Sequence, residues 1–580
     1  MTATTATRIS IIDRIRRHTT WLVAALLPLL GAGALSSALS SCGGGVAALA
    51  LGGVGTGGTG LTIGTVVALG SVGVDDHEYD SQAPQYYEDG NATATPATVV
   101  GLGQRIHVET DAANNPLTMT VEPTLVGTIQ GTPTIHADGV TGSFVVNGVT
   151  VVTNIDPAAG PVTFYVGLTD ITSLADGTRV QVHGLFHGNA GGTGNTIQAT
   201  RIALSPATDT ATRITGVVTG LAPNATGESF QIAGSGMTVQ MTSATPTEPA
   251  GAALANGQVV NVLSATAPSG TMIAADNVRI HGLAGTTTTA AVEGLASGSG
   301  GVFTVDGVAV DATAPGLPAV HDGDAIVVTG QEDANGTLHA SAIRAYATQP
   351  AQVRLKGTIT GYVSDSRFLV RGVPVDAGGV VVTTVAGGTP AALGNGVYVE
   401  ITGNPGGSGQ GDVVVAASVA SSSVPPVGAV VDYLGTIGGF VGDASPFTLR
   451  GTFGGVTDPT VTLTDNVQTV NGTEGSLADG KAVEVEGTVT ANGLTVYSLT
   501  FLGSAPTPSD TNGVVHGYVA GGSAFTVNGI VLTLTGATMF YDGTATSTPP
   551  PWFTDGAPVE VNYTQSGGQN LAQSINFDGD

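Results

Sequence analysis

The sequence predicts an all-β fold, and three observations lead to this prediction. Apolar and polar residues alternate over short stretches, as expected of strands that bury one face. Glycine and proline, 88 and 29 of 580 residues, punctuate these stretches, and both residue types favour turns. A turn followed by a strand recurs about every 75 residues, while no helical periodicity of useful length is found outside the N-terminal leader.

The recurring motif is clearest in residues 478–487, where Asp479-Gly480 begins a turn, valines alternate along a strand, and Gly487 ends it. An Asp-Gly or Asn-Gly pair supplies the backbone conformations that tight turns require. The related copies place their turn glycines at Gly177, Gly257, Gly323, Gly396 and Gly556.

A second motif lies upstream of each copy and consists of an aromatic residue, a strand, a tight turn and another strand. An Asn-Gly or Asp-Gly pair between alternating stretches is the strongest short signal for a β-hairpin. The clearest turns are Asn147-Gly148, Asp306-Gly307 and Asn528-Gly529. Arg371-Gly372 and Arg450-Gly451 occupy the same place in two other copies.

Each repeat therefore contains about five strands, and a small closed barrel is the simplest way to leave no strand edge exposed. We expect a tandem array of about seven five-stranded, OB-like β-barrel modules, with one core in each. The first module is the most divergent, and its hairpin turn is predicted at Asp75-Asp76. The predicted boundaries are 61–124, 125–206, 207–286, 287–348, 349–424, 425–506 and 507–580.

Two segments rich in serine and proline, Ser421–Pro426 and Ser504–Ser509, are predicted to be linkers between modules.

The charge of the chain argues against some partners. Only 10% of the residues are charged, against a usual fraction of about 25%, and the formal net charge is -27. Such a charge repels the phosphates of nucleic acids, so we expect no nucleic-acid partner. High negative charge is also typical of a protein kept in solution outside the cytoplasm.

Residues 1–42 have the pattern of a lipoprotein signal peptide. Arginines come first, an apolar stretch from Trp21 to Leu35 follows, and Ser41-Cys42 precedes three glycines. Leu39-Ser40-Ser41-Cys42 resembles a bacterial lipobox, in which the cysteine is acylated, so we expect the thiol of Cys42, the only cysteine of the chain, to be lipidated.

A lipid-anchored chain would contact the membrane through its N-terminus. More than one acyl chain is needed for stable anchoring. Gly43 follows the cysteine where an inner-membrane retention aspartate could stand, and by resemblance to enterobacterial lipoprotein sorting this implies the outer membrane, facing either the periplasm or the cell surface. The Gly-rich residues 43–60 are predicted to form a flexible tether.

The sequence around Cys42, the Phe-x-Val-Asn-Gly-Val hairpin and the Asp-Gly-x-x-Val-x-Val-x-Gly strand together resemble the bacterial domain of unknown function family 5666. The resemblance covers most of residues 61–580 and is strongest at Leu125–Leu204, Ala290–Ala345 and Gly513–Phe577. It implies tandem small β units in secreted or lipid-anchored proteins. The family carries no established activity, and hence no functional residues, that could be transferred to this chain.

Candidate sites in the sequence have plain structural interpretations. His183 and His187 are four residues apart, but a glycine lies between them, so surface histidines are expected rather than metal ligands. An acidic cluster around His77 and the shorter Asp-Gly-Asp segments could bind a cation through oxygen atoms, although solvated turns are the simpler interpretation. These acidic groups are Asp75, Asp76, Glu78, Asp80, Asp322, Asp324, Asp578 and Asp580.

Aromatic residues provide a further set of candidates, because they could stack on sugars. Core or isolated surface positions are the simpler interpretation of these residues, which are Tyr79, Tyr86, Tyr87 and Trp552. No serine-nucleophile elbow, paired catalytic carboxylates or phosphate-binding loop can be assigned. We therefore expect no catalytic residue, cofactor or bound metal.

Three functions are consistent with these patterns. The preferred one is a non-enzymatic, lipid-anchored envelope scaffold or adhesion array that meets an envelope protein or a glycan. The alternative is a carbohydrate- or small-ligand-binding envelope protein. An envelope hydrolase with a site between repeats is the least favoured.

Overall fold

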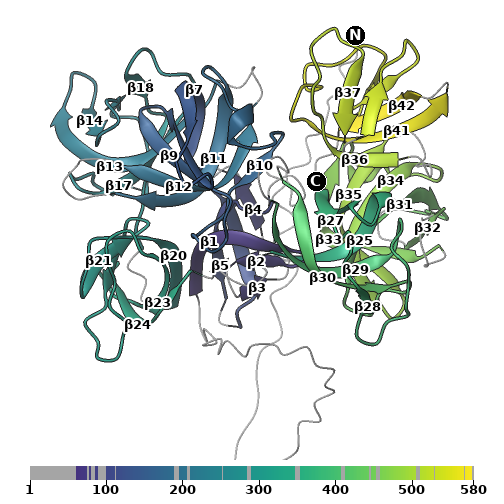
Figure 1. The fold of residues 1–580 in the computed structure, drawn as a ribbon, viewed down its shortest axis with the longest axis horizontal. Helices are drawn as coiled ribbons and strands as arrows, with labels where there is room; N and C mark the ends of the chain where they lie inside the picture. The colour runs from purple at the N-terminus through teal and green to yellow at the C-terminus, as the bar shows by residue number, and fades with distance from the viewer. Residues whose placement is uncertain are drawn as a thin grey trace, which may run out of the picture. The chain divides into compact units, whose positions relative to one another are not determined.

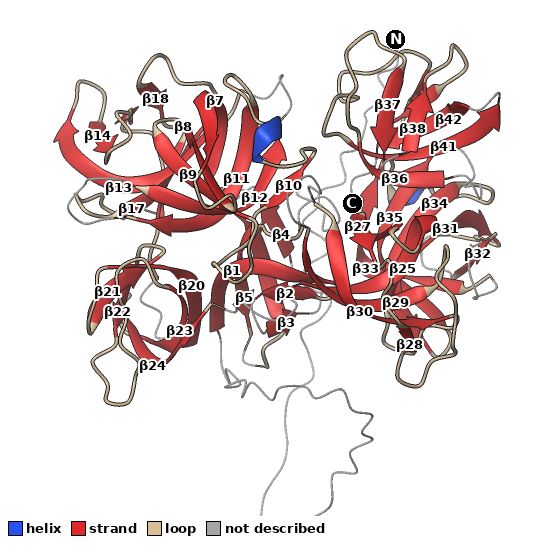
Figure 2. Cartoon of the chain, in the orientation of Figure 1, coloured by secondary structure: helices blue, strands red, loops and turns tan. Residues whose placement is uncertain are grey.

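The structure is a computed structural model, and its strands are drawn in Figures 1 and 2. It describes residues 60–577 with short gaps, so the predicted signal peptide, Cys42 and nearly all of the predicted tether lie outside the described residues. The gaps are residues 75–76, 80–84, 89–99, 112, 189–194, 206–209, 251, 284–288, 347–352, 407–411, 443–445, 452–457, 504–509, 528–529 and 567–568.

The prediction of an all-β fold is confirmed. Helical turns in the described residues are limited to two short 3-10 segments, η2 (Ile171–Ser173) and η3 (Glu474–Ser476). Within the same residues no helix is long and apolar enough to cross a membrane.

One closed barrel shows the strand order that recurs along the chain. Its first three strands form a meander, the fourth pairs with the first, and the fifth lies between the third and the fourth, giving the order β31-β32-β33-β35-β34. The third and fifth strands run parallel, whereas the other neighbours are antiparallel. The strands are β31 (Val430–Gly438), β32 (Phe447–Arg450), β33 (Thr460–Val470), β34 (Ala482–Thr490) and β35 (Gly493–Leu502).

Further five-stranded rings with the same pairing precede it. In the β7–β12 barrel, β7 pairs with β8 and β11, β9 pairs with β8 and β12, and β11 with β12. Its strands are β7 (Leu125–Ile135), β8 (Thr141–Val146), β9 (Val149–Asn154), β10 (Phe164–Val166), β11 (Arg179–His187) and β12 (Thr196–Leu204).

The β20–β24 barrel and the β25–β30 barrel close in the same way. Figure 1 shows the β20–β24 barrel as a ring of strands. The strands are β20 (Thr289–Ser297), β21 (Val302–Val305), β22 (Val308–Asp311), β23 (Ala325–Glu332), β24 (Leu338–Ala345), β25 (Val353–Ser364), β26 (Arg367–Val370), β27 (Val373–Asp376), β28 (Val382–Thr384), β29 (Tyr398–Pro405) and β30 (Val414–Ser422).

In the β13–β19 barrel the last strand is split in two. β15 pairs with β18, and β17 pairs with β19 and β13. The strands are β13 (Thr212–Pro223), β14 (Glu228–Ile232), β15 (Thr238–Gln240), β16 (Thr247–Glu248), β17 (Val259–Ser264), β18 (Met272–Ala274) and β19 (Asn277–Ile280).

The two ends of the described chain carry related sheets. The N-terminal sheet pairs β2 and β5 with β1, and β6 with β5 and β4. The C-terminal sheet has the order β36-β41-β42-β38-β37. These strands are β1 (Gly60–Leu69), β2 (Val72–Val74), β3 (His77–Tyr79), β4 (Gln85–Glu88), β5 (Arg105–Thr110), β6 (Pro116–Val121), β36 (Asp510–Val514), β37 (Ala524–Val527), β38 (Ile530–Thr533), β39 (Met539–Tyr541), β40 (Ala545–Thr546), β41 (Pro558–Ser566) and β42 (Gln569–Phe577).

The recurring Asp-Gly or Asn-Gly turn precedes the fourth strand and is hydrogen-bonded to the first strand or its continuation. Each turn glycine has a positive φ of 77° to 93° and donates its N–H to a carbonyl there, as Gly480 does to Ile437 over 2.7 Å. The preceding side chain accepts a second bond from that strand's continuation, as Asp479 Oδ1 does from the Phe440 N–H at 2.7 Å. Asp176, Asn256, Asp322, Asn395 and Asp555 form the equivalent bond.

The glycine that ends the motif permits a β-bulge in the fourth strand. A Cβ atom at Gly487 would lie 2.5 Å from the Thr495 carbonyl oxygen, and one at Gly330 would lie 2.2 Å from that of His339. The pairing register shifts at both positions. The last residue of the motif is therefore glycine because the backbones approach so closely there that no side chain would fit.

The barrels are joined more closely than the sequence predicts. β1 continues the sheets of two other barrels by pairing parallel with β20 and β25, and β7 pairs with β13. The expectation of one core per module is also wrong, because a single apolar cluster contains residues of both the β7–β12 and β13–β19 barrels. Paired strands bring the apolar faces of neighbouring barrels into contact.

Two local predictions are wrong. Ser421 and Ser422, predicted as part of a linker, are buried at the end of β30, and Ser421 donates a hydrogen bond to the Ala391 carbonyl. Arg450-Gly451 is not a tight hairpin turn, because β33 begins only at Thr460. The other predicted linker, Ser504–Ser509, lies outside the described residues.

Candidate functional site

A group of buried charges surrounds Arg105, at the start of β5. Its Nη1 atom lies 2.9 Å from Glu293 Oε1 on β20, and its Nη2 atom lies 2.9 Å from Asp306 Oδ2. Nη2 also donates to the Glu293 carbonyl over 2.8 Å. The arginine side chain is only 4% exposed, so a buried cation is held by groups from another barrel.

The backbone positions Asp306 for this contact. Asp306 and Gly307 form the hairpin turn between β21 and β22, with φ values of 50° and 81°. The turn directs the Asp306 carboxylate toward Arg105 and toward His281, whose Nδ1 lies 3.5 Å from Asp306 Oδ1 and 3.2 Å from the Asp306 carbonyl oxygen. Burial alone would raise the pKa of Asp306, but Arg105 and His281 beside it hold that pKa below its usual range.

Glu293 behaves differently although it shares the same arginine. Burial raises the pKa of Glu293 and outweighs the opposing effects of Arg105 and Thr65, whose hydroxyl donates to Oε1. One guanidinium group thus serves two buried carboxylates, with the charge of Asp306 the better stabilised.

A second charge group adjoins the first and centres on Glu122. Arg279 Nη1 lies 2.9 Å from Glu122 Oε1, and Arg279 Nε donates to Glu248 Oε2 over 2.7 Å. The Nε2 atoms of His107 and His281 lie 3.5 and 3.8 Å from the Glu122 carboxylate. Burial would raise the pKa of Glu122, but Arg279 and the two histidines lower it.

The two histidines respond oppositely to this environment. Burial lowers the pKa of His107, and the attraction of Glu122 does not compensate. Burial also opposes protonation of His281, but its contacts with Asp306 raise the pKa of that histidine above its ordinary value.

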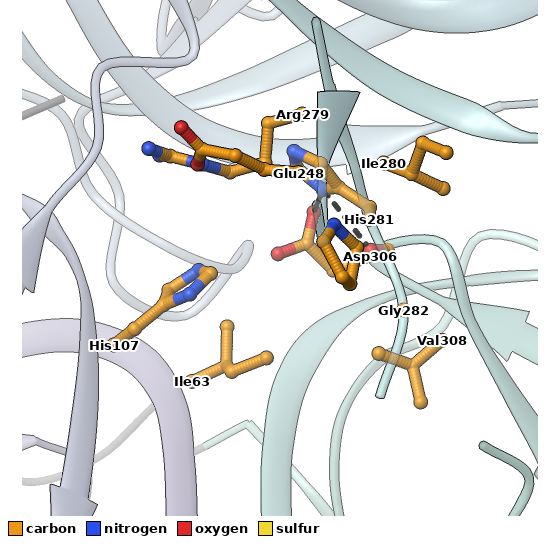
Figure 3. Close-up of a pocket in the computed structure, with 10 residues that line it drawn as sticks. Ile63, His107, Glu248, Arg279, Ile280, His281, Gly282, Asp306 and Val308 are labelled. Atoms are coloured by element: carbon orange, nitrogen blue, oxygen red, sulfur yellow. Dashed lines mark hydrogen bonds and ion pairs between the residues drawn. The ribbon is translucent and has the colours of Figure 1, made fainter. Parts of the chain in front are cut away.

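A pocket of about 230 Å³ opens beside these groups. Figure 3 shows His107 and Ile63 on one side, and Ile280 and Val308 on the other. Glu248, Arg279, His281 and Asp306 supply its polar wall. The pocket therefore combines donors, acceptors and apolar surface from strands that are distant in the sequence.

Hairpin turns reach across to neighbouring barrels in three copies. Asn147 donates to the Arg213 carbonyl oxygen on β13 at 3.4 Å, Asp306 meets Arg105, and Arg371 forms an ion pair with Glu486 on β34. All three residues have a positive φ, between 50° and 53°. The first residue of each of these turns thus adopts the positive φ that the turn requires and also contacts a neighbouring barrel.

The structure places the predicted histidines differently from expectation. His183 is fully buried, so its interpretation as a surface residue is wrong, and its Nδ1 accepts a bond from the Arg105 N–H at 3.3 Å. His187 is partly exposed and lies 3.2 Å from Asp322 Oδ1, so these two sequence candidates meet across barrels. A β-bulge at His183/Gly184 lies between the two histidines and interrupts the regular alternation of side chains along β11.

The acidic candidates form no metal site in the described residues, where no group of three or more His, Cys, Asp and Glu side chains is arranged to hold a metal. Glu78 instead pairs with Arg354 and Lys356 on β25. Asp324 lies 3.2 Å from His321 Nδ1. The remaining members, Asp75, Asp76, Asp80, Asp578 and Asp580, lie outside the described residues.

The aromatic candidates do not gather into a platform. Tyr79 and Tyr86 are buried in the core, and Tyr87 is half-buried on β4. Trp552 packs against Phe540, Phe553 and Phe577, and its Nε1 donates to Asp542 over 2.8 Å.

Sequence reasoning missed the residues of the pocket and the charge network. One signal was available: in a chain with few charges, Glu293 stands within the apolar stretch Ala290–Leu295 of a predicted strand. A charge at such a position indicates a buried partner. The partner itself could not be identified, because Arg105 lies 188 residues away.

Together these features define an all-β protein made of several small five-stranded barrels that contact one another through buried polar groups. Residues 215–276 and 512–576 match the family model described as Domain of unknown function (DUF5666). This is the family that the sequence motifs resemble, and the second match coincides with one of the three strongest regions of that resemblance. No curated protein matches the chain.

Proposed function

We propose that this protein is a lipid-anchored, non-enzymatic scaffold of the cell envelope, built from about seven OB-like modules. The strand order supports the module type. Within β31–β35 the fourth strand lies beside the first, which is the Greek-key arrangement, and a fifth strand closes the barrel, as in the OB fold.

The observation that carries the scaffold proposal is the use of hairpin turns as contacts between barrels. Asn147, Asp306 and Arg371 occupy the same turn position, yet their bonds differ: an amide to a carbonyl, a carboxylate to a guanidinium, and a guanidinium to a carboxylate. Different chemistry at each junction favours one neighbour over another. A chain that needs defined neighbours is suited to holding surfaces in a set arrangement.

Calorimetry of the full-length protein tests the scaffold proposal. Barrels joined by buried contacts should unfold together, whereas independent barrels would unfold in separate transitions. We expect the β1–β6 sheet and the β20–β24 barrel to share one transition in the wild-type protein, with Arg105→Met separating them. Hydrogen exchange of the two regions identifies which transition belongs to each. Separate transitions in the wild-type protein would contradict the proposal.

The lipid anchor rests on the sequence around Cys42 and has its own test. Metabolic labelling with an alkyne-bearing fatty acid should label the wild-type protein and fail to label Cys42→Ala. Membrane fractionation should then find the variant released from the outer-membrane fraction. Unchanged fractionation of an unlabelled variant would remove the anchor from the proposal and leave the scaffold role standing.

A further inference from the structure

We propose that the pocket beside His281 binds a small, neutral, polyhydroxylated ligand the size of a single sugar residue. This site goes beyond the scaffold role, and it does not depend on membrane anchoring.

The first support is a buried polar atom without a hydrogen bond. The His281 side chain is 10% exposed and lines the pocket, and its Nδ1 is occupied by the Asp306 carbonyl. Its Nε2 has no hydrogen-bond partner among the described residues, the carboxylate of Glu122 being 3.8 Å away. Buried polar atoms are normally satisfied, so an atom of this kind on a residue that lines a pocket indicates a ligand group.

The charges around the pocket argue for a neutral ligand. Arg105 is hydrogen-bonded to Asp306, and Arg279 forms an ion pair with Glu122 and a hydrogen bond to Glu248. Each charged group of the wall therefore already has an opposite charge on the protein. An ionic ligand would find no uncompensated partner, and its desolvation would oppose binding.

The wall also places hydrogen-bond donors and acceptors close together. Ligand hydroxyl groups suit such a wall because a hydroxyl can both donate and accept a hydrogen bond. Glu248 accepts from Asn277 and Arg279 through its two oxygens, and each oxygen retains a lone pair for a ligand hydroxyl. Ile63, Ile280 and Val308 supply apolar surface for the carbon–hydrogen face of a sugar ring. At about 230 Å³ the pocket is smaller than sites for drug-sized ligands, which begin at about 300 Å³.

Gly282 gives a way to block the pocket without removing its polar groups. It lines the pocket, a Cβ atom added there meets nothing within 4 Å, and its φ is not in the left-handed region. Gly536 shares the last two properties but is not among the residues that line the pocket, so Gly536→Phe is a matched control for Gly282→Phe.

The test is a binding screen on full-length protein, using saturation-transfer NMR followed by calorimetric titration. The probes are glucose, galactose, N-acetylglucosamine and myo-inositol, with phosphate, acetate and ethylamine as ionic comparisons. We expect at least one neutral probe to bind saturably with a Kd of about 1 mM or lower. Gly282→Phe and His281→Ala should weaken that binding at least tenfold, whereas Gly536→Phe should leave it unchanged.

Other outcomes overturn the proposal. These are the absence of saturable binding by every neutral probe, equal binding by wild-type protein and Gly282→Phe, and binding of only an ionic probe. Unfolding curves of each variant show whether a loss of binding reflects loss of the fold. If Gly282→Phe does not fold, Glu248→Gln replaces it, because the exposed rim of the pocket tolerates an isosteric change and a lost acceptor should still weaken the binding.

Discussion

Asp306 and Arg105 are 201 residues apart in the chain, and their carboxylate and guanidinium groups are bonded over 2.9 Å in a buried site. The bond joins a hairpin turn of the β20–β24 barrel to the first residue of β5. It is therefore a contact between repeats, although the turn that carries it was recognisable from two adjacent residues.

Removal of the Arg105 charge should be strongly destabilising. Arg105→Met leaves the carboxylates of Asp306 and Glu293 buried without their cation, and breaking a buried pair in this way costs about 3–5 kcal/mol of unfolding free energy. Urea unfolding measures the loss. The control is Arg354→Met, whose partly exposed pair with Glu78 should contribute less than about 1 kcal/mol. Similar losses in both variants would contradict a special role for the buried network.

His183 should make the protein less stable as the solution is acidified. Burial, and then the positive charge of Arg201, lower the pKa of His183 to about 3, while a backbone hydrogen bond opposes this shift. The unfolded chain protonates the same ring near pH 6.5, so between these values the unfolded state binds more protons and stability rises with pH.

His183→Gln removes this proton linkage. Below about pH 6.5 the wild-type protein should lose up to about 1.4 kcal/mol per pH unit relative to the variant. The stability difference between the two proteins should stay constant from pH 7.5 to 9, which is the internal control. A difference that is flat from pH 4 to 7 would show that the buried histidine does not behave in this way.

Replacing the bulge glycine Gly330 by alanine, which has the smallest side chain, should lower the stability of the protein. Gly330→Ala places a Cβ 2.2 Å from the His339 carbonyl oxygen, so the paired strands must separate locally, at a cost of about 1–3 kcal/mol. Gly536→Ala, where the added atom meets nothing, should change stability by less than about 0.5 kcal/mol. Thermal unfolding of the two variants decides the point, and equal midpoints would refute it.

Replacing the carboxylate of Asp479 in the turn by an amide should cost little stability. Asp479→Asn keeps the oxygen that receives the Phe440 N–H, and Asn256 and Asn395 already occupy the same position in other copies. We expect near wild-type stability for Asp479→Asn and a loss of about 0.5–1.5 kcal/mol for Asp479→Ala, measured by chemical denaturation. Equal losses would mean that the charge, rather than the acceptor, matters.

The parts of the fold that the sequence predicts are the parts decided by neighbouring residues. Asp479-Gly480 and Asn147-Gly148 are turns because of their own backbone preferences, and both turn glycines have the expected positive φ. Alternation likewise predicts the strands, because burial on one face is a local pattern. The Arg-Gly pair does not decide the turn, because Arg371-Gly372 forms a tight hairpin between β26 and β27 whereas Arg450-Gly451 lies in a longer connection between β32 and β33.

The junctions and the pocket could not be predicted in this way. The Asp306-Gly307 pair predicts a turn, which accounts for the backbone of Asp306 but says nothing about the partner of its carboxylate. His183 alternates like a surface residue of β11, yet a neighbouring strand covers it. Both outcomes depend on which barrels are neighbours. The repeat motif recurs from barrel to barrel, so it does not indicate which barrels contact each other.

The parallel pairing of β1 has a consequence for how the chain is made. Thr65 of β1 and Glu293 of β20 are hydrogen-bonded across 228 residues, and β25 follows later still. A chain that emerges from its N-terminus presents β1 long before either partner exists, so one hydrogen-bonding edge of β1 stays open until β20 and β25 have been made. Non-local pairing of this kind slows folding and exposes the edge to other chains. β1, the first of the described strands to be made, is thus fully paired only after β20 and β25 have followed, and until then its open edge can pair with other chains.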